Sequence, residues 1–344
     1  MSTGPTALPE VRAGFTGRLI DSVGVVIIGR NEGERLKRCL ESVCPTTPRV
    51  VYVDSGSTDD SVNLSQSFGA AVVQLDPAVP FTAARARNAG CRKLLASAPG
   101  LDYVFFVDGD CEVSDTWIGW AVRFLDEHPD YAVVWGRRRE RYPEKSIYNA
   151  LCNFEWEDYA LGETKACGGD VVMRVTAFNQ AQGYNDALIC GEEPELCVRL
   201  RRLNWRIWHA DEAMTLHDAN MLHFSQWWKR MLRGGYAYAQ GVDMHGAPPE
   251  RHCVAESRRV WIWGLGIPLA VVVLAAFFGW RALLLLGVYP LQVARIALRG
   301  TRSPRDNWLQ AGALVIGKFA EVLGQIKFVI ARWRRVQSKL IEYK

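Results

Sequence analysis

The most constraining feature of this sequence is an alternation of short apolar segments with longer segments of helical periodicity. NEGERLKRCLESV, which follows the first apolar segment, has apolar side chains three or four positions apart. Because parallel strands need crossovers between them, the alternation predicts an α/β fold with a doubly wound, mostly parallel sheet. The predicted strands are GVVIIG (24–29), RVVYV (49–53), AAVVQL (70–75) and YVFFV (103–107).

Three polar clusters follow predicted strands. Ligands of open α/β sheets bind beyond the carboxyl ends of the strands, so we expect these clusters to converge on one crevice. Asp108 and Asp110, separated by one glycine, offer the oxygen ligands with which a divalent cation can bridge diphosphate oxygens. The structural alternative is a solvated turn. The clusters are Arg30-Asn31-Glu32, Asp54-Ser55-Gly56-Ser57 and Asp108-Gly109-Asp110.

A charge-poor stretch lies in the C-terminal part of the chain. Arg281 is the only charged residue between positions 260 and 294. The first 21 residues of this stretch would form a helix of roughly 30 Å, the thickness of a bilayer core, whereas 282–294 is too short to cross. We expect a hydrophobic helical hairpin over 255–300 with Arg281 near its tip, or a re-entrant segment. Arginines flank both ends, which predicts that both lie in the cytoplasm.

The last part of the chain, 304–344, is basic. Residues 299–344 hold ten Lys or Arg and three acids. The pattern predicts an amphipathic helix and tail that lie in the membrane interface and attract anionic lipids. A helix that packs on the protein or forms a homo-oligomer is the alternative. The apolar positions at helical spacing are Leu309, Ile316, Phe319, Leu323, Ile326, Ile330 and Trp333.

Composition narrows the class further. The nine cysteines include no Cys-x-x-Cys pair, and the first residues show no export signal. We therefore expect a catalytic domain in the cytoplasm, attached to the inner membrane. The net charge of +4 comes with no nucleic-acid reading motif, so no nucleic-acid partner is expected.

The order of several motifs resembles that of the family-2 glycosyltransferases, which are inverting enzymes with the GT-A fold. The resemblance covers roughly residues 23–241. It implies a catalytic domain at 23–245 after an irregular segment at 1–22. The motifs are VVIIGRNEGERLKRCLESV, VVYVDSGSTDDS, ARARNAG, FFVDGD and CGEEPELCVRLR.

The resemblance implies roles for residues of the nucleotide crevice. Asp54 corresponds to the acid that recognises the nucleobase, and Asn31 with Glu32 to the turn that lines the nucleoside pocket. Arg87 corresponds to an arginine near the base and phosphates. Asp108 would face the ribose and the metal, and Asp110 would be the main ligand of Mg²⁺ or Mn²⁺.

Glu192 and Glu193 fall where the family places an acidic pair that includes the catalytic base. An inverting transfer needs a carboxylate near the acceptor to take the proton of the attacking hydroxyl. The alignment of the pair favours Glu193, with Glu192 as the alternative because Pro194 follows and glutamate replaces aspartate. Acids are also favoured in the first turn of a helix, and the two interpretations are compatible.

Other candidates follow from weaker signals. His217 would be an additional metal ligand or a hydrogen-bonding residue. Arg230 and Arg233, three apart on one helix face, would hold the donor diphosphate or lie on phospholipid headgroups. Gly168 and Gly169 resemble the small-residue turn beside the acceptor pocket.

These features together predict an inverting transfer of a sugar from a nucleotide-diphosphate donor at the cytoplasmic membrane face. A UDP-sugar is the default donor by resemblance. The acceptor is predicted to be lipid-linked because of the anchor, with a growing glycan or a protein as alternatives. The rival classes are a nucleotidyltransferase, for which GRNEGER is a poor phosphate loop, and a non-catalytic membrane scaffold.

Overall fold

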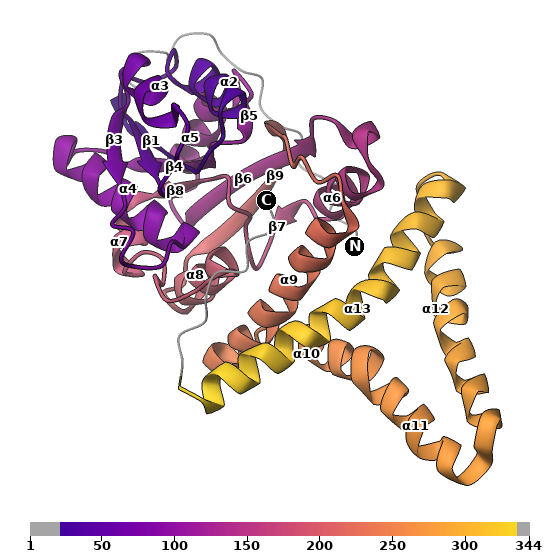
Figure 1. The fold of residues 1–344 in the computed structure, drawn as a ribbon. Helices are drawn as coiled ribbons and strands as arrows, with labels where there is room; N and C mark the ends of the chain where they lie inside the picture. The colour runs from indigo at the N-terminus through magenta and orange to yellow at the C-terminus, as the bar shows by residue number, and fades with distance from the viewer. Residues whose placement is uncertain (1–20, 336–344) are drawn as a thin grey trace, which may run out of the picture.

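The computed structural model of the chain describes residues 21–335. Most of the segment predicted to be irregular, 1–22, and the end of the basic tail, 336–344, therefore lie outside the described residues. The described part consists of a globular α/β unit and a set of C-terminal helices that project from it (Figure 1).

A nine-stranded mixed sheet forms the centre of the globular unit, in the order β3-β2-β1-β4-β8-β6-β9-β5, with β7 paired to β9. The first four strands in this order are parallel to one another, which confirms the predicted doubly wound α/β arrangement. β8 is antiparallel to both of its neighbours. The strands are β1 Val23–Gly29, β2 Val50–Asp54, β3 Ala71–Gln74, β4 Tyr103–Asp108, β5 Cys111–Val113, β6 Tyr131–Glu140, β7 Gly162–Glu163, β8 Val171–Arg174 and β9 Arg206–His217.

Helices cover both faces of the parallel part, which is why β1 and β4 are almost continuously apolar. α4 lies so close to the sheet at Gly90 that a side chain at this position would collide with Val26. Thr82 caps this helix by accepting a hydrogen bond from the amide of Arg85. The helices of this unit are α2 Glu34–Val43, α3 Ser61–Ser67, α4 Ala83–Ser97, α5 Trp117–Glu127, η1 Pro143–Lys145, α6 Ile147–Glu157, α7 Val175–Gln180 and α8 Glu192–Arg202.

The C-terminal helices form an open triangle in which α13 is the base and two apolar arms meet at a tip (Figure 1). Arg281 lies in the 3-10 segment at this tip, as a hairpin requires. The helices are α9 Phe224–His245, α10 Val254–Trp261, the π-helical η2 Ile262–Gly266, α11 Ile267–Phe278, the 3-10 helix η3 Gly279–Gly287, α12 Val288–Ala297 and α13 Pro304–Trp333.

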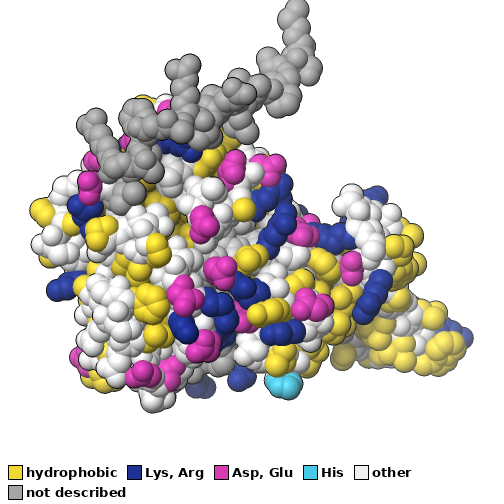
Figure 2. Space-filling model, turned by 90° about the horizontal axis from the view of Figure 1, so that it is seen from above, with side chains coloured by type: hydrophobic (Ala, Val, Ile, Leu, Met, Phe, Trp, Pro, Cys, Tyr) yellow, Lys and Arg dark blue, Asp and Glu magenta, His cyan; other side chains and the backbone are white. Residues whose placement is uncertain are grey.

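The arms expose most of their apolar side chains. Val254–Ala297 is long and apolar enough to cross a membrane, and only 11% of its most apolar window is buried. Phe277 and Leu284 are 78% and 72% exposed. The projecting part at the right of Figure 2 is accordingly dominated by hydrophobic side chains. A soluble protein rarely exposes so continuous an apolar surface.

α9 and α13 cross at close range, and the crossing depends on two glycines. A side chain at Gly235 of α9 would collide with the backbone of Glu321, and one at Gly324 of α13 would collide with the carbonyl oxygen of Leu232. α9 continues through Gly234 and Gly235 to His245. Gly235 and Gly324 lie inside their helices and let the two helices approach each other closely.

α13 is partly buried and partly exposed. Ala311, Val315 and Ala320 are buried, and the helix packs mainly against α9. Ile316, Leu323 and Trp333, three of the predicted apolar positions, are exposed. Packing on the protein and exposed apolar side chains, which the sequence presented as alternatives, thus occur together on this helix.

Candidate functional site

Two loops at the carboxyl ends of β1 and β2 are joined by hydrogen bonds. The amide of Asn31 donates to Oγ of Ser57 over 2.9 Å, and its side-chain oxygen accepts from the amide of Thr58 over 2.7 Å. Asp54 accepts from the amides of Gly56 and Ser57, each over 3.0 Å. The structure therefore brings Asn31 and Asp54 to one edge of the sheet. Glu32 lies in the same turn and pairs with Arg35 over 2.7 Å.

Arg87 is buried in α4 and binds three carboxylates. Its Nη2 lies 2.9 Å from Oδ1 of Asp108, and its Nη1 lies 2.9 Å from Glu192 and 2.7 Å from Glu193. Arg87 thus joins the end of β4 to the start of α8. A buried guanidinium of this kind holds its carboxylates in fixed positions.

The acidic pair occupies the first turn of α8, after Gly191 in the left-handed conformation. The side chain of Glu192 is 5% exposed and that of Glu193 is 15% exposed. Burial and the like charge of Glu192 raise the pKa of Glu193 to about 7, although the Arg87 guanidinium acts in the opposite direction. A carboxylate with this pKa is suited to accept a proton at neutral pH.

Gly169 lies between the two halves of this arrangement. A Cβ atom at this position would be 2.6 Å from Nη2 of Arg87, 3.2 Å from Oε1 of Glu193 and 3.3 Å from Oδ2 of Asp108. The two carboxylates therefore meet at the Arg87 guanidinium beside Gly169, and a side chain at this position would collide with that guanidinium. Gly168 borders open space instead.

A cluster of potential metal ligands lies beside Asp108. Ligand atoms of Asp110, Cys111 and His217 all lie within 4.8 Å of one another. Oδ2 of Asp110 is 3.3 Å from Nε2 of His217. Neighbouring ligands of an octahedral ion with bonds of about 2.1 Å are about 3 Å apart, so this carboxylate and imidazole fit Mg²⁺ or Mn²⁺. Asp108, also predicted as a ligand, pairs with Arg87 and Arg138, and its role as a metal ligand stays a prediction.

His217 is oriented by Glu140 from the end of β6. Nδ1 of His217 lies 3.3 Å from Oε2 of Glu140, whose side chain is fully buried. Burial and the positive charge of Arg138 lower the pKa of His217. A neutral imidazole is the form that binds metals.

Sequence reasoning missed three residues of this site. Arg138 and Asp170 form an ion pair over 3.5 Å, and Asp170 accepts from the amide of Asp108 and the hydroxyl of Thr215. Glu140 is the third. The strand-end clusters gave no signal for them, although Asp170 follows the Gly168-Gly169 pair directly.

The two basic candidates of α9 have local partners. Arg230 pairs with Glu155 of α6 over 2.9 Å, and Arg233 donates to the carbonyl oxygen of Ile189 over 2.7 Å. These contacts connect α9 to α6 and to the loop before α8. A diphosphate contact for either arginine stays a prediction.

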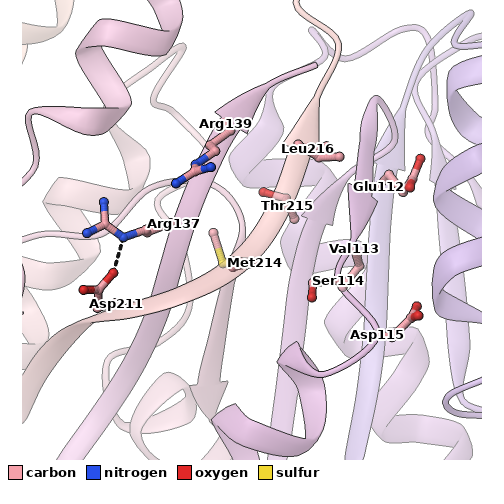
Figure 3. Close-up of a pocket in the computed structure, with 11 residues that line it drawn as sticks. Glu112, Val113, Ser114, Asp115, Arg137, Arg139, Asp211, Met214, Thr215 and Leu216 are labelled. Carbon is pink, nitrogen blue, oxygen red and sulfur yellow. Dashed lines mark hydrogen bonds and ion pairs between the residues drawn. The ribbon is translucent and has the colours of Figure 1, made fainter. Parts of the chain in front are cut away.

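A cavity of about 670 Å³ lies elsewhere, along β5, β6 and β9 (Figure 3). Arg137 and Arg139 of β6 line it, with Arg137 bound to Asp211. Strand neighbours point to opposite faces of a sheet, and Arg138 between them contacts Asp108. None of the predicted site residues lines this cavity.

The sheet order, the strand-end carboxylates and the acidic pair on α8 together define a glycosyltransferase with the GT-A fold. Residues 24–180 match the family model for Glycosyl transferase family 2, which makes this part of the chain a glycosyltransferase domain of that family.

Two similar proteins support this assignment, and one solved structure supports the fold. Succinoglycan biosynthesis protein ExoA of Rhizobium meliloti is 23% identical over 280 residues, which are 77% of this chain and 81% of that protein. The uncharacterized glycosyltransferase RC0292 of Rickettsia conorii is 33% identical over 96 residues, covering 28% of this chain and 31% of its own. The structure of mannosyltransferase PcManGT from Pyrobaculum calidifontis, in complex with GDP-Man and Mn²⁺, has a TM-score of 0.59 at 18% identity. The structural match covers 89% of this chain and 87% of the PcManGT chain, and it confirms the fold.

Proposed function

We propose that this protein transfers a sugar, with inversion, from a nucleotide-diphosphate donor to a lipid-linked acceptor at the cytoplasmic face of the inner membrane. The observation that carries the proposal is that Arg87 binds both Asp108 and Glu193 and thereby holds the two carboxylates together beside Gly169. A donor ribose at Asp108 would thereby lie near a base that can deprotonate the acceptor.

The residues divide the work between donor and acceptor sides. Asn31, Glu32 and Asp54 would bind the nucleoside, and Asp108 its ribose. Glu193 would take the proton of the acceptor hydroxyl while that hydroxyl attacks the anomeric carbon. Arg87 would keep Glu193 in position. The positive charge of Arg87 would be shared between Glu193 and Glu192.

Asp110 and His217 would hold Mg²⁺ or Mn²⁺. When bound, this cation neutralises charge on the departing nucleotide diphosphate. The fit of the carboxylate and the neutral imidazole supports this assignment, as does the Mn²⁺ in the complex of PcManGT.

The donor is proposed to be a UDP-sugar, with a GDP-sugar as the competitor because PcManGT was solved with GDP-Man. The similarity to a succinoglycan biosynthesis protein supports a role in polysaccharide assembly. Family membership favours glycosyl transfer over the nucleotidyltransferase and scaffold alternatives.

The apolar arms support the proposed location. α11 and α12 would enter the membrane with η3 deepest, while the exposed apolar side chains of α13 lie in the interface. Arg258 and Arg259 before α11 and Arg295 at the end of α12 would stay on the cytoplasmic side. The acceptor would then reach the site from the membrane surface.

The test is nucleotide release from a panel of nucleotide sugars by the purified chain, with membrane lipid extract as acceptor. We expect one donor to be consumed only with the extract and a divalent cation present. Asp110→Ala and Glu193→Gln are expected to abolish this turnover. Full transfer by both variants would refute the proposed function.

A further inference from the structure

A second cavity lies where the globular unit meets the C-terminal helices. It has a volume of about 360 Å³ and lies between α6, α9 and α13. Its walls combine aromatic rings with hydrogen-bonding side chains. The polar part of the lining includes Glu155, Asp158, Tyr159, Tyr238 and Gln310.

The charged side chains that line this cavity are matched by opposite charges. Glu155 pairs with Arg230 over 2.9 Å, and Lys318 pairs with Glu321 over 2.5 Å. Asp158 pairs over 2.8 Å with Arg302, which precedes α13. Each charged side chain of the lining is thus already engaged in an ion pair. A neutral ligand suits this lining, because it leaves these ion pairs in place.

The uncharged lining favours a ligand with many hydroxyl groups. Gln310 has both a donor and an acceptor group, and its Nε2 already donates to Asp158 over 2.6 Å. Carboxylates held by a guanidinium or ammonium group keep further lone pairs with which to accept from hydroxyls. Tyr159 and Tyr238 add ring faces that pack on apolar C–H surfaces. Aromatic rings with a few fixed polar groups are typical of small-ligand sites, and this combination suits a sugar ring.

Two aromatic residues near the end of α6 connect this cavity with the candidate site. Tyr159 lines the cavity, and its ring packs edge-on against Trp135 of β6 at 5.3 Å. Trp156 packs with the cavity residues Cys152 and Met231 in one apolar cluster, and its ring lies edge-on to that of His217 at 4.8 Å.

The opposite side of the cavity reaches the apolar surface. Leu314 lines the cavity and is 47% exposed on α13. A molecule in the cavity could therefore continue along α13 toward the lipid while its other end points to Tyr159.

We propose that the cavity between α6, α9 and α13 binds a neutral sugar unit of the acceptor glycan, adjacent to the unit that receives the new sugar. The inference rests on the proposed function, since it places an acceptor with a glycan and a lipid at this site. The contact region between the catalytic domain and the membrane helices would thereby help to select the acceptor.

The experiment uses the full chain in lipid nanodiscs. Binding of cellobiose, lactose and mannobiose is followed by saturation-transfer NMR without donor, and transfer kinetics are measured with lipid extract as acceptor. Ala313→Phe fills the cavity, and Ala331→Phe is its matched control on the same helix outside the cavity. Gln310→Ala removes one hydrogen-bonding group without changing a charge, and the exposed Gln66→Ala is its control.

We expect at least one disaccharide to bind the wild type and both controls. Gln310→Ala should weaken binding by up to about tenfold, the value of one hydrogen bond. Ala313→Phe should abolish binding and raise the acceptor KM, with the donor KM unchanged.

Three results would overturn the inference. They are binding of no disaccharide by the wild type, equal effects of Ala313→Phe and Ala331→Phe, and displacement of a bound disaccharide by farnesyl phosphate but not by other disaccharides. The last result would assign the cavity to a lipid headgroup. Failure of the proposed function would appear separately, as absence of donor turnover in the wild type.

Discussion

Nη1 of Arg87 lies 2.7 Å from Oε1 of Glu193, and the same guanidinium binds Asp108 over 2.9 Å. The carboxylate proposed as the base and the one proposed to face the donor therefore share one buried counter-charge. This relationship couples the start of α8 to the end of β4, and it leads to the first three predictions.

Replacing Glu193 by glutamine should remove the proton acceptor and keep its shape. We expect kcat to fall by about 10²- to 10⁴-fold, the usual contribution of a general base. Donor binding, measured by calorimetry with the nucleotide sugar, should change little. Glu163→Gln, at an exposed pair on β7, is the control. A variant that retains more than half of the wild-type kcat would exclude Glu193 as the base.

The pH dependence of transfer should follow the ionisation of Glu193. Burial and Glu192 raise the pKa of Glu193 to about 7, and only the ionised carboxylate accepts a proton. The rate should therefore rise with pH up to about 7 and level off above it. Below the pKa it should fall about tenfold per pH unit, since protonation then removes the base in proportion. A rate at pH 5 equal to that at pH 8, at saturating donor and metal, would contradict this assignment.

Arg87→Ala should destabilise the fold as well as the site. The substitution leaves Asp108, Glu192 and Glu193 without their shared counter-charge, and removing one partner of a buried ion pair costs about 3–5 kcal/mol. Urea unfolding of the catalytic unit, followed by tryptophan fluorescence, measures the loss. Arg92→Ala, at an exposed position of the same helix, should change stability little. Equal stability of the two variants would mean that Arg87 is not essential to this network.

Glu140→Gln should weaken metal binding without removing a ligand. Glu140 orients His217 through Nδ1, and loss of such an outer contact typically costs about 10- to 100-fold in metal affinity. Mn²⁺ titration followed by electron paramagnetic resonance tests this independently of turnover. Glu112→Gln, in the neighbouring β5, is the control because Glu112 pairs with Arg141 instead. Unchanged Mn²⁺ affinity would show that Glu140 does not contribute to metal binding through His217.

Two glycines of α13 should respond oppositely to alanine. Gly324→Ala forces a methyl group into the carbonyl oxygen of Leu232 and should destabilise the contact with α9 by about 1–3 kcal/mol. Gly312 has open space around it, so Gly312→Ala should stabilise the helix by up to about 1 kcal/mol through helix propensity. Thermal unfolding of the two variants in one detergent gives the comparison. Stabilisation by both substitutions would show that the helices are not in close contact.

The sequence predicted the main elements because their signals are local. The strand over 103–107 and the helical segment NEGERLKRCLESV appear as β4 and α2, Tyr103–Asp108 and Glu34–Val43. Periodicity and capping are properties of neighbouring residues, so they can be recognised without knowledge of the fold. The same holds for the apolar stretch and for Arg281 at its turn.

The partners of the site residues were not predictable in this way. Arg87 and Glu192 are 105 positions apart, and His217 and Glu140 are 77 apart. No spacing rule connects such pairs, because their proximity follows from the order of the strands. Asp170 and Arg138 were missed for this reason, although each lies in or next to a strand that the site uses.

What the sequence alone determined is the alternation of strands and helices, the carboxylates at the end of β4, the acids at the start of α8 and the apolar stretch, since residue type and local spacing specify each. The tertiary structure alone decided that Arg87 binds the acidic pair, that Glu140 orients His217, and that Gly235 and Gly324 bring α9 and α13 together. These contacts join distant parts of the chain, and only the packing of sheet and helices brings them within reach.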